Sequence, residues 1–191
     1  MKPISLKNAI TGIKKGKLVV YPTDTLYGLG ADIFNVPAVQ KIYKVKRRPL
    51  DLPLPVMVSD MAMMKTVAHI TPTEKKIITK FLPGPLTIIL KKKQIVPDII
   101  TKKKIAIRMP KNKIALYLAS CSGPLTATSA NIHGGQEPRT INIAREQIGT
   151  RDIVYLDHGP LPGIPSTIIE TIEDNIKIYR EGAISREELY G

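Results

Sequence analysis

The chain has 191 residues, of which 43% are hydrophobic and 24% charged; this is the composition of an ordinary globular protein and excludes a fibrous or largely disordered chain. Lysine and arginine total 29 against 16 acidic residues, and a net charge of +13 favours a polyanionic partner such as a nucleotide or a nucleic acid. A lysine-rich surface that is merely solvated would give the same excess.

No apolar run reaches the roughly 20 residues needed to span a bilayer, so we expect no membrane insertion. Residues 1–17 lack the apolar block of a signal peptide, which predicts a cytoplasmic protein. The length is that of one domain and no linker or repeat interrupts it, so residues 1–191 are predicted to form a single domain. The single cysteine, Cys121, has no second cysteine for a disulfide or a zinc site.

The first elements along the chain are a helix, a strand and a polar loop. Amphipathic periodicity predicts a helix over Ser5–Lys15, ended by Gly16, and the apolar run Leu18–Tyr21 predicts a buried strand. The segment Pro22–Ala31 is rich in hydroxyl groups and glycine, which is typical of a loop that brings its backbone against a ligand. A second helix is predicted over Val36–Lys46.

The remaining elements follow from the same periodicities. We expect helices over Asp60–His69, Thr71–Phe81, Lys111–Ala119 and Ile141–Ile148, and a short last helix that begins at Ser185. We expect strands over Leu54–Val58, Leu86–Leu90, Ile105–Arg108, Pro124–Thr128, Ile153–Leu156, Thr167–Ile169 and Ile176–Tyr179. Strands and helices do not alternate strictly, so the predicted fold class is mixed α/β (α+β). It is a twisted sheet of parallel and antiparallel strands, with flanking helices around a basic concave cleft.

Four cations gather where the Val36–Lys46 helix is predicted to end: Lys44, Lys46, Arg47 and Arg48. Cations at this position interact favourably with the helix dipole, which is one explanation for them. The alternative is that the proline after Arg48 makes a rigid exit, from which a guanidinium is held out to bind a phosphate in a bidentate manner.

The segment Thr126–Asn131 ends a predicted strand with small polar side chains. Ser129 and Asn131 stand two apart, so in an extended segment both project to the same side, where both can donate to phosphate oxygens. A turn in which they satisfy local backbone groups is the alternative. The sequence contains neither a Walker loop nor a dinucleotide fingerprint, which argues against a conventional ATPase or oxidoreductase.

Seven segments match, in order and approximate spacing, the motifs of the YrdC-like family over about residues 5 to 185. They are Pro22–Ala31, Lys46–Pro49, Pro83–Thr87, Ile107–Pro110, Ser129–Asn131, Pro165–Thr167 and Arg180–Ile184. The chain therefore resembles the threonylcarbamoyl-AMP synthases of this family, in the short form without an additional C-terminal domain. The resemblance implies a YrdC-like fold and a nucleotidyltransferase. Such an enzyme condenses L-threonine, bicarbonate or carbon dioxide, and ATP into threonylcarbamoyl-AMP and pyrophosphate, for the threonylcarbamoyladenosine modification of tRNA.

The resemblance also implies how ATP is bound. Lys46, Arg48, Ser129 and Asn131 would form a clamp for the phosphates, and Arg180 would approach the nucleotide. Lys46 and Arg48 would be the catalytic residues, because they stabilise the negative charge of the carbamate and of the pentavalent phosphorus. Mg²⁺ is expected to be bound through the ATP phosphates, without a protein-built metal site.

The threonine pocket implied by the resemblance is lined by Thr25, Arg108, Ala127 and Ser166, with Arg108 paired to the substrate carboxylate. The implied partners are ATP, L-threonine, bicarbonate and a downstream tRNA threonylcarbamoyl transferase. The basic face could in addition bind tRNA or double-stranded RNA.

Several positions depart from the pattern of the family. Arg47 stands where the family often has glycine, Leu52 where it has a polar residue and Met57 where it has histidine, and the segment His133–Arg139, which includes Glu137, is altered. Two alternatives therefore stay open. One is a module that binds double-stranded RNA or tRNA without synthase activity; the other is a relative that adenylates another carbamate.

Overall fold

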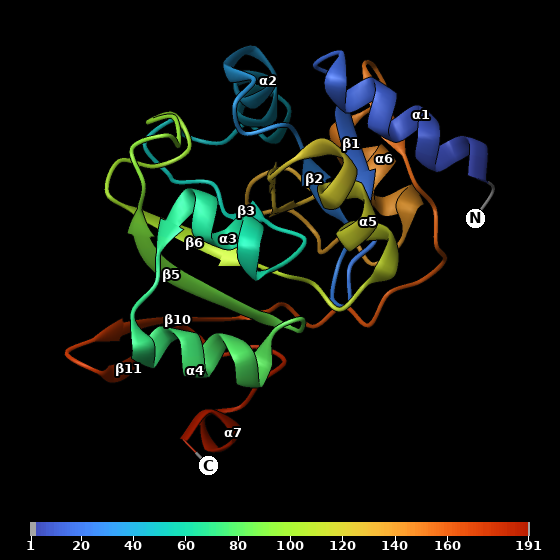
Figure 1. Cartoon of the computed structure of the whole chain (residues 1–191). Coiled ribbons are helices and arrows are strands. Elements are labelled where there is room, and N and C mark those ends of the chain that lie inside the picture. Colours follow the sequence, from blue (N-terminus) through green and yellow to red (C-terminus); the bar gives the residue numbers. More distant parts are fainter. Residues whose placement is uncertain (1–2, 191) are drawn as a thin grey trace.

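The computed structural model describes residues 3–190, whose strands form two sheets (Figure 1). The four-stranded sheet has the order β8-β2-β1-β9, and the seven-stranded sheet has the order β11-β10-β5-β6-β3-β7 with β4 paired to β5. The strands are β1 (Leu18–Tyr21), β2 (Gly28–Gly30), β3 (Val56–Met57), β4 (Ala68–His69), β5 (Leu86–Lys92), β6 (Lys104–Arg108), β7 (Leu125–Thr126), β8 (Thr128–Ser129), β9 (Ile153–Tyr155), β10 (Thr167–Ile172) and β11 (Asn175–Arg180). The helices are α1 (Pro3–Lys14), α2 (Val36–Lys46), α3 (Met61–Val67), α4 (Pro72–Phe81), α5 (Lys113–Ser122), α6 (Ile141–Ile148) and α7 (Arg186–Tyr190).

Both sheets mix parallel and antiparallel pairs, which confirms the predicted mixed α/β class. In the first sheet β1 is parallel to β9 and antiparallel to β2; in the second, β5 is parallel to β10 and antiparallel to β6. The sequence predicted one sheet, whereas the strands form two. The division falls at Ala127, because β7 on one side of it pairs with β3 and β8 on the other side pairs with β2.

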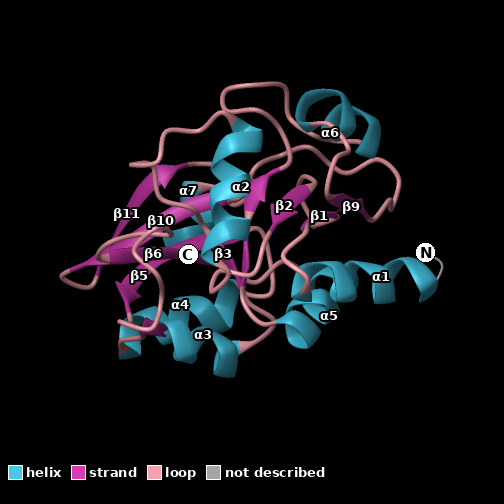
Figure 2. Cartoon of the chain, turned by 90° about the horizontal axis from the view of Figure 1, so that it is seen from above, coloured by secondary structure: helices cyan, strands magenta, loops and turns pink. Residues whose placement is uncertain are grey.

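The four-stranded sheet is covered by helices on both faces, and the alternation of β1 shows how. Val19 and Tyr21 pack in one apolar cluster with α1 and α5, whereas Leu18 and Val20 belong to the other cluster, which includes α6. Figure 2 shows α1 and α5 on one side of β1, β2 and β9 and α6 on the other. A strand buried on both faces reads as a continuous apolar run, as β1 does.

Helices α3 and α4 pack against one face of the seven-stranded sheet. Its inward-facing residues alternate along each strand, and Ile88, Ile107 and Ile169 pack against Met64 of α3 and Ile78 of α4 in one cluster. The residues between them, such as Thr87, Arg108 and Ile168, line a cavity on the opposite face. This part of the opposite face is the floor of the candidate site.

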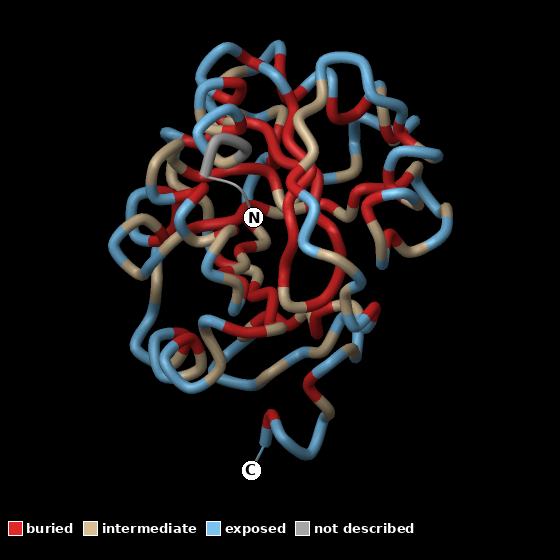
Figure 3. The backbone as a smooth tube through the Cα atoms, turned by 90° about the vertical axis from the view of Figure 1, so that its right-hand side faces the viewer, coloured by how far each residue is buried: buried red, intermediate tan, exposed pale blue. Residues whose placement is uncertain are grey.

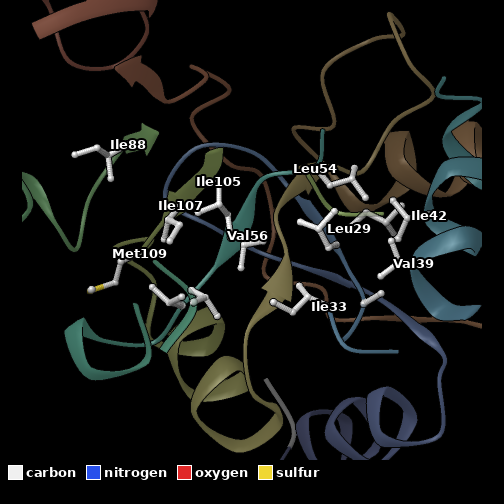
Figure 4. Close-up of a cluster of buried hydrophobic side chains, with 14 of the residues drawn as sticks. Leu29, Ile33, Val39, Ile42, Leu54, Val56, Ile88, Ile105, Ile107 and Met109 are labelled. Carbon is white, nitrogen blue, oxygen red and sulfur yellow. The ribbon is translucent and has the colours of Figure 1, made fainter. Parts of the chain in front are cut away.

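The two sheets share one apolar core. Figure 4 shows it running from Val39 and Ile42 of α2 through Leu29 of β2 to Val56 and Ile107 of the second sheet. Buried segments lie at the centre of the molecule and exposed segments lie at its periphery (Figure 3). The common core fixes the position of one sheet against the other, and therefore the geometry of the cleft between them. Among the described helices, none combines the length and the apolar character needed to cross a membrane.

Several predicted boundaries differ from the structure, and four of the differences have a clear local cause or divide an element. The expected helix Asp60–His69 ends at Val67, because Ala68 is extended and pairs with Lys92. The expected helix Lys111–Ala119 begins at Lys113, because Asn112 caps it, and runs on to Ser122. The expected strand Leu54–Val58 is reduced to β3, and Pro124–Thr128 is divided between β7 and β8. β2 was not predicted at all, because Gly28–Gly30 falls in the segment expected to be a loop.

Candidate active site

A cavity of about 380 Å³ opens where loops of the first sheet meet the face of the second sheet that carries Thr87, Arg108 and Ile168. Two groups of side chains face each other across it. One group comes from the β1–β2 loop, the exit of α2 and the β8 turn: Thr25, Arg48, Ser129 and Asn131. The other comes from β5, β6 and the segments around β10 and β11: Thr87, Arg108, Ser166 and Arg180. The site is therefore assembled from segments of both sheets.

Eight of the nine residues singled out from the sequence line this cavity. They are Thr25, Arg48, Arg108, Ala127, Ser129, Asn131, Ser166 and Arg180. The ninth, Lys46, lies behind the wall of the cavity, only 2% exposed. The structure thus brings eight of the predicted residues together around one cavity. Lys46 contacts Ser129 and Asn131 from the side away from the cavity.

Lys46 supports the turn that carries Ser129 and Asn131. Its Nζ donates to the carbonyl oxygens of both residues at 2.6 Å and contacts Oδ1 of Asn131 at 3.2 Å. Three acceptors use all three donors of an ammonium group. Burial, followed by the nearby charge of Arg48, lowers the pKa of Lys46 to about 7. A neutral amine donates only two hydrogen bonds, so the protonated form is the one that satisfies the turn.

Arg48 faces the cavity from the end of α2. Its Nη2 donates to the carbonyl of Pro53 at 2.9 Å, its Nε lies 3.4 Å from the carbonyl of Leu52, and Nη1 lies 3.4 Å from Nδ1 of His133. Burial lowers the pKa of Arg48, but a guanidinium stays protonated under any physiological condition. The backbone carbonyls hold a fixed cation at the cavity wall, and bidentate binding of a phosphate by this guanidinium stays a prediction.

Ser129 and Asn131 form the local turn that was one of the two alternatives, and they also line the cavity; donation to phosphate oxygens stays a prediction. Ser129 Oγ donates to Oδ1 of Asn131 at 2.6 Å, and Nδ2 of Asn131 donates to the carbonyl of Gly135 at 2.8 Å. The backbone N–H of Asn131 donates to the carbonyl of Ser129 at 3.0 Å. The turn fixes both side chains beside Arg48.

The opposite wall carries a second cationic group. Arg180 donates through Nε and Nη2 to the carbonyl of Ser166 at 3.0 and 2.8 Å, and Ser166 Oγ lies 2.8 Å from Oγ1 of Thr87. Burial, together with the charge of Arg108, lowers the pKa of Arg180. Arg108 forms an ion pair with Asp24 at 2.6 Å. Two arginines and two hydroxyl groups can receive an anionic ligand on this side.

The glycines of β2 are explained by Tyr21. A Cβ atom at Gly28 would lie 2.7 Å from the ring of Tyr21, and one at Gly30 would lie 2.9 Å from it. The hydroxyl of this buried tyrosine donates to the carbonyl of Thr126 at 3.1 Å, and burial raises the pKa of Tyr21. The ring therefore fixes the distance between β1, β2 and the strand end that leads to Ser129.

Sequence reasoning gave no role to several polar residues around the cavity, among them two that line it and two that contact its arginines. Thr87 and Glu137 line it, Asp24 pairs with Arg108, and His133 contacts Arg48. Thr87 and Asp24 lie inside quoted motifs, which was the available signal. Of the positions that depart from the family pattern, Met57 lines the cavity, whereas Leu52 contributes its backbone carbonyl to Arg48.

The donor set around the cavity does not itself provide a metal site. Among residues 3–190, no three side chains of His, Cys, Asp or Glu lie close enough together to hold a metal ion. The cationic groups suit phosphate and carboxylate ligands, and a metal ion carried by a polyphosphate can enter with it.

The comparisons with known proteins fit this fold and site. The model of the Sua5/YciO/YrdC family, described as "Telomere recombination", matches residues 11–182, so the chain belongs to this family. A putative threonylcarbamoyl-AMP synthase from Methanocaldococcus jannaschii is 43% identical over 93% of this chain and 85% of its own length. The threonylcarbamoyl-AMP synthase of Pyrococcus abyssi is 37% identical over 93% of this chain, which spans 54% of that protein.

A solved structure shows the same architecture. Sua5 from P. abyssi in complex with L-threonine matches 96% of this chain and 56% of that one, with a TM-score of 0.90 and 36% sequence identity. The YrdC-like fold predicted from the sequence is confirmed.

Proposed function

We propose that this protein is a threonylcarbamoyl-AMP synthase that makes threonylcarbamoyl-AMP and pyrophosphate from L-threonine, bicarbonate or carbon dioxide, and ATP. The observation that carries the proposal is the meeting of two anion-binding groups in one cavity: Arg48 with Ser129 and Asn131, and Arg108 with Ser166. The names of the synthases from M. jannaschii and P. abyssi support it independently. The product serves the threonylcarbamoyladenosine modification of tRNA.

In this proposal the two walls divide the substrates. Arg108 receives the carboxylate of L-threonine, with Thr25, Ala127 and Ser166 around the amino acid. Arg48, Ser129 and Asn131 receive the phosphates, while Arg180 approaches the nucleotide and Lys46 fixes the phosphate-facing turn from behind. A guanidinium matches a carboxylate or a phosphate with two parallel hydrogen bonds, so each wall has a donor of suitable geometry.

The chemistry needs no protein nucleophile. The amine of L-threonine attacks carbon dioxide and releases one proton to solvent, or attacks bicarbonate and releases water; either route gives a carbamate. A carbamate oxygen then attacks the α-phosphorus, the bond from this phosphorus to the bridging oxygen breaks, and pyrophosphate leaves. Negative charge grows at the phosphorus, where Arg48 is the fixed cation of the proposed site. Positioning three reactants in one cavity contributes roughly 7 to 11 kcal/mol to lowering the barrier. Mg²⁺ bound to the phosphate oxygens supplies further charge neutralisation, and ATP brings it to the site.

The test is the release of pyrophosphate by the purified protein with ATP, Mg²⁺, L-threonine and bicarbonate. We expect release that requires L-threonine, together with a product of the mass of threonylcarbamoyl-AMP. Arg48→Ala should lower kcat/KM by about 100-fold, the scale of removing one preorganised charged group from the reacting centre. Arg47→Ala is the matched control, because it removes the same charge one residue away, outside the cavity.

Other results would favour the two alternatives. Pyrophosphate release that does not depend on L-threonine indicates a relative that adenylates another carbamate, as Met57 in the cavity wall would allow. Absent turnover with tight, salt-sensitive binding of duplex RNA indicates an RNA-binding module. The downstream transferase, direct contact with tRNA and a cytoplasmic location stay predictions, and the first two can be measured with the same purified protein.

A further inference from the structure

Asp24 is a nearly buried carboxylate to which the proposed reaction assigns no step. Its Oδ1 accepts a hydrogen bond from Nη2 of Arg108 at 2.6 Å, and the two side chains are only 14% and 11% exposed. Among residues 3–190, Arg108 belongs to the wall of the cavity and Asp24 does not. Asp24 therefore stands behind the arginine that faces the ligand.

Both partners of this ion pair are anchored to rigid segments. Asp24 lies in the β1–β2 loop, where Oγ1 of Thr23 accepts from the backbone N–H groups of Thr25 and Leu26 at 3.1 and 3.2 Å. Arg108 ends β6, and its carbonyl accepts from the N–H of Val58 at 3.0 Å. The ion pair thus connects the loop of the first sheet with a strand of the second, across the cleft.

The ion pair leaves two buried polar atoms without a partner within residues 3–190. Oδ2 of Asp24 and Nε of Arg108 are both buried and have no hydrogen-bond partner among the described residues. A buried ion pair contributes little net stability unless its remaining polar atoms are satisfied, so stability alone does not account for this one. Arg108 also acts on Arg180: its charge adds to burial in lowering the pKa of Arg180, which means that the two guanidinium groups repel each other.

We propose that Asp24 is a positioning residue that holds the guanidinium of Arg108 in the orientation that receives the carboxylate of the amino-acid substrate. The inference rests on the proposed function, because it assigns Arg108 to that carboxylate. Without Asp24, Arg108 keeps its charge but loses its fixed orientation, and the repulsion from Arg180 drives it from the productive position. Loss of Asp24 therefore weakens the binding of the amino-acid substrate and leaves the binding of ATP nearly unchanged.

The variant Asp24→Asn tests this, because it keeps the shape of the side chain and an oxygen acceptor and removes the charge. We expect KM for L-threonine to rise about tenfold, the lower range for losing a partner that orients a ligand-binding group, with KM for ATP changed less than about twofold. Calorimetric titration of L-threonine should show the same weakening without turnover. Asp98→Asn is the matched control, because Asp98 pairs with Lys92 in an exposed position outside this cavity.

A double-mutant cycle with Arg108→Lys separates positioning from a direct role. If Asp24 acts through Arg108, adding Asp24→Asn to Arg108→Lys raises KM for L-threonine less than about twofold further. A full second tenfold increase would show that Asp24 acts independently of Arg108 and would overturn the proposal.

The failures of the two proposals are distinguishable. A wild-type protein that releases no pyrophosphate with L-threonine refutes the proposed function. A wild-type protein that does so, with an Asp24→Asn variant of unchanged KM for L-threonine or an equal rise for ATP, refutes the role of Asp24 alone. Thermal unfolding monitored by circular dichroism verifies the fold, and if Asp24→Asn does not fold, Asp24→Ser replaces it with the same measurements and the same deciding outcomes.

Discussion

At the scale of single residues, Lys46 acts as an internal support of the turn that contains Ser129 and Asn131. Replacing it with methionine keeps most of the volume and removes three donors, leaving the carbonyls of Ser129 and Asn131 without their bonds to Nζ. We expect Lys46→Met to lower the free energy of unfolding by about 3 kcal/mol, the range for removing one partner of a buried hydrogen-bonded charge. KM for ATP should rise as the turn loosens. Urea denaturation and pyrophosphate kinetics measure the two effects.

Lys44 provides the control for this substitution. It stands one half-turn earlier in the last turn of α2 and is exposed, so Lys44→Met changes the same chemical group without touching the Ser129–Asn131 turn. We expect its stability and KM for ATP to stay near the wild-type values. Equal losses in the two variants would mean that helix charge, and not the bonding of Nζ to the turn, determines the effect.

The residues of the site could be named from motifs, but their contacts could not. The sequence predicted that Ser129 and Asn131 project together beside Arg48, and the structure places all three on one wall. The sequence did not indicate that Lys46 is enclosed behind these three residues, because a run of cations at a helix end is equally compatible with an exposed lysine. The pair of Asp24 and Arg108 was equally invisible, because 84 positions separate its members and only the meeting of two sheets joins them.

At the scale of elements, the exit of α2 contains a strained residue. Arg47 has φ 50° and ψ 40°, the left-handed conformation in which glycine is favoured and in which the resembling family often has glycine. We expect Arg47→Gly to raise the free energy of unfolding by about 1 kcal/mol, because it relieves this conformation. Lys44→Gly, inside the helix, should lower it by a similar amount. Urea denaturation of both variants is the measurement, and a destabilised Arg47→Gly would contradict the explanation.

Helix ends were predicted better than short strands, for a physical reason. A cap is a local interaction, and the helix expected from Thr71 does start there with a capping box, in which Thr71 and Glu74 exchange hydrogen bonds. The predicted start at Ser185 is confirmed by the same exchange with Glu188. β2 has no such local signal: its glycines are there to accommodate the ring of Tyr21, a contact that exists only after β1 and β2 pair.

At the scale of the whole molecule, the charge of +13 is not confined to the cavity. A second, larger hollow of about 850 Å³ lies at the end of β5 and β6 where residues 93–103 join these two strands. No residue lines both this hollow and the cavity of the candidate active site. It includes Lys91, Lys102 and Lys103, which are exposed and form no ion pair within residues 3–190, whereas Lys104 pairs with Glu170. Unpaired ammonium groups at one end of the molecule give a field that attracts a phosphate backbone by release of its counterions.

This distribution predicts that RNA affinity and catalysis can be separated by mutation. Replacing Lys91, Lys102 and Lys103 with glutamine should weaken tRNA binding and lower the slope of log affinity against log salt by up to about 3, roughly one unit for each lysine that no longer neutralises a phosphate. KM for ATP and for L-threonine should not change, because these lysines lie outside the cavity of the candidate active site.

The control variant replaces three exposed lysines in and directly after α1, namely Lys7, Lys14 and Lys15. It removes the same charge from the opposite side of the molecule (Figure 1). If both triple variants lower the slope equally, net charge alone governs binding. If only the variant of Lys91, Lys102 and Lys103 lowers it, RNA docks at the hollow that these lysines line. Filter-binding titrations at several salt concentrations decide between them.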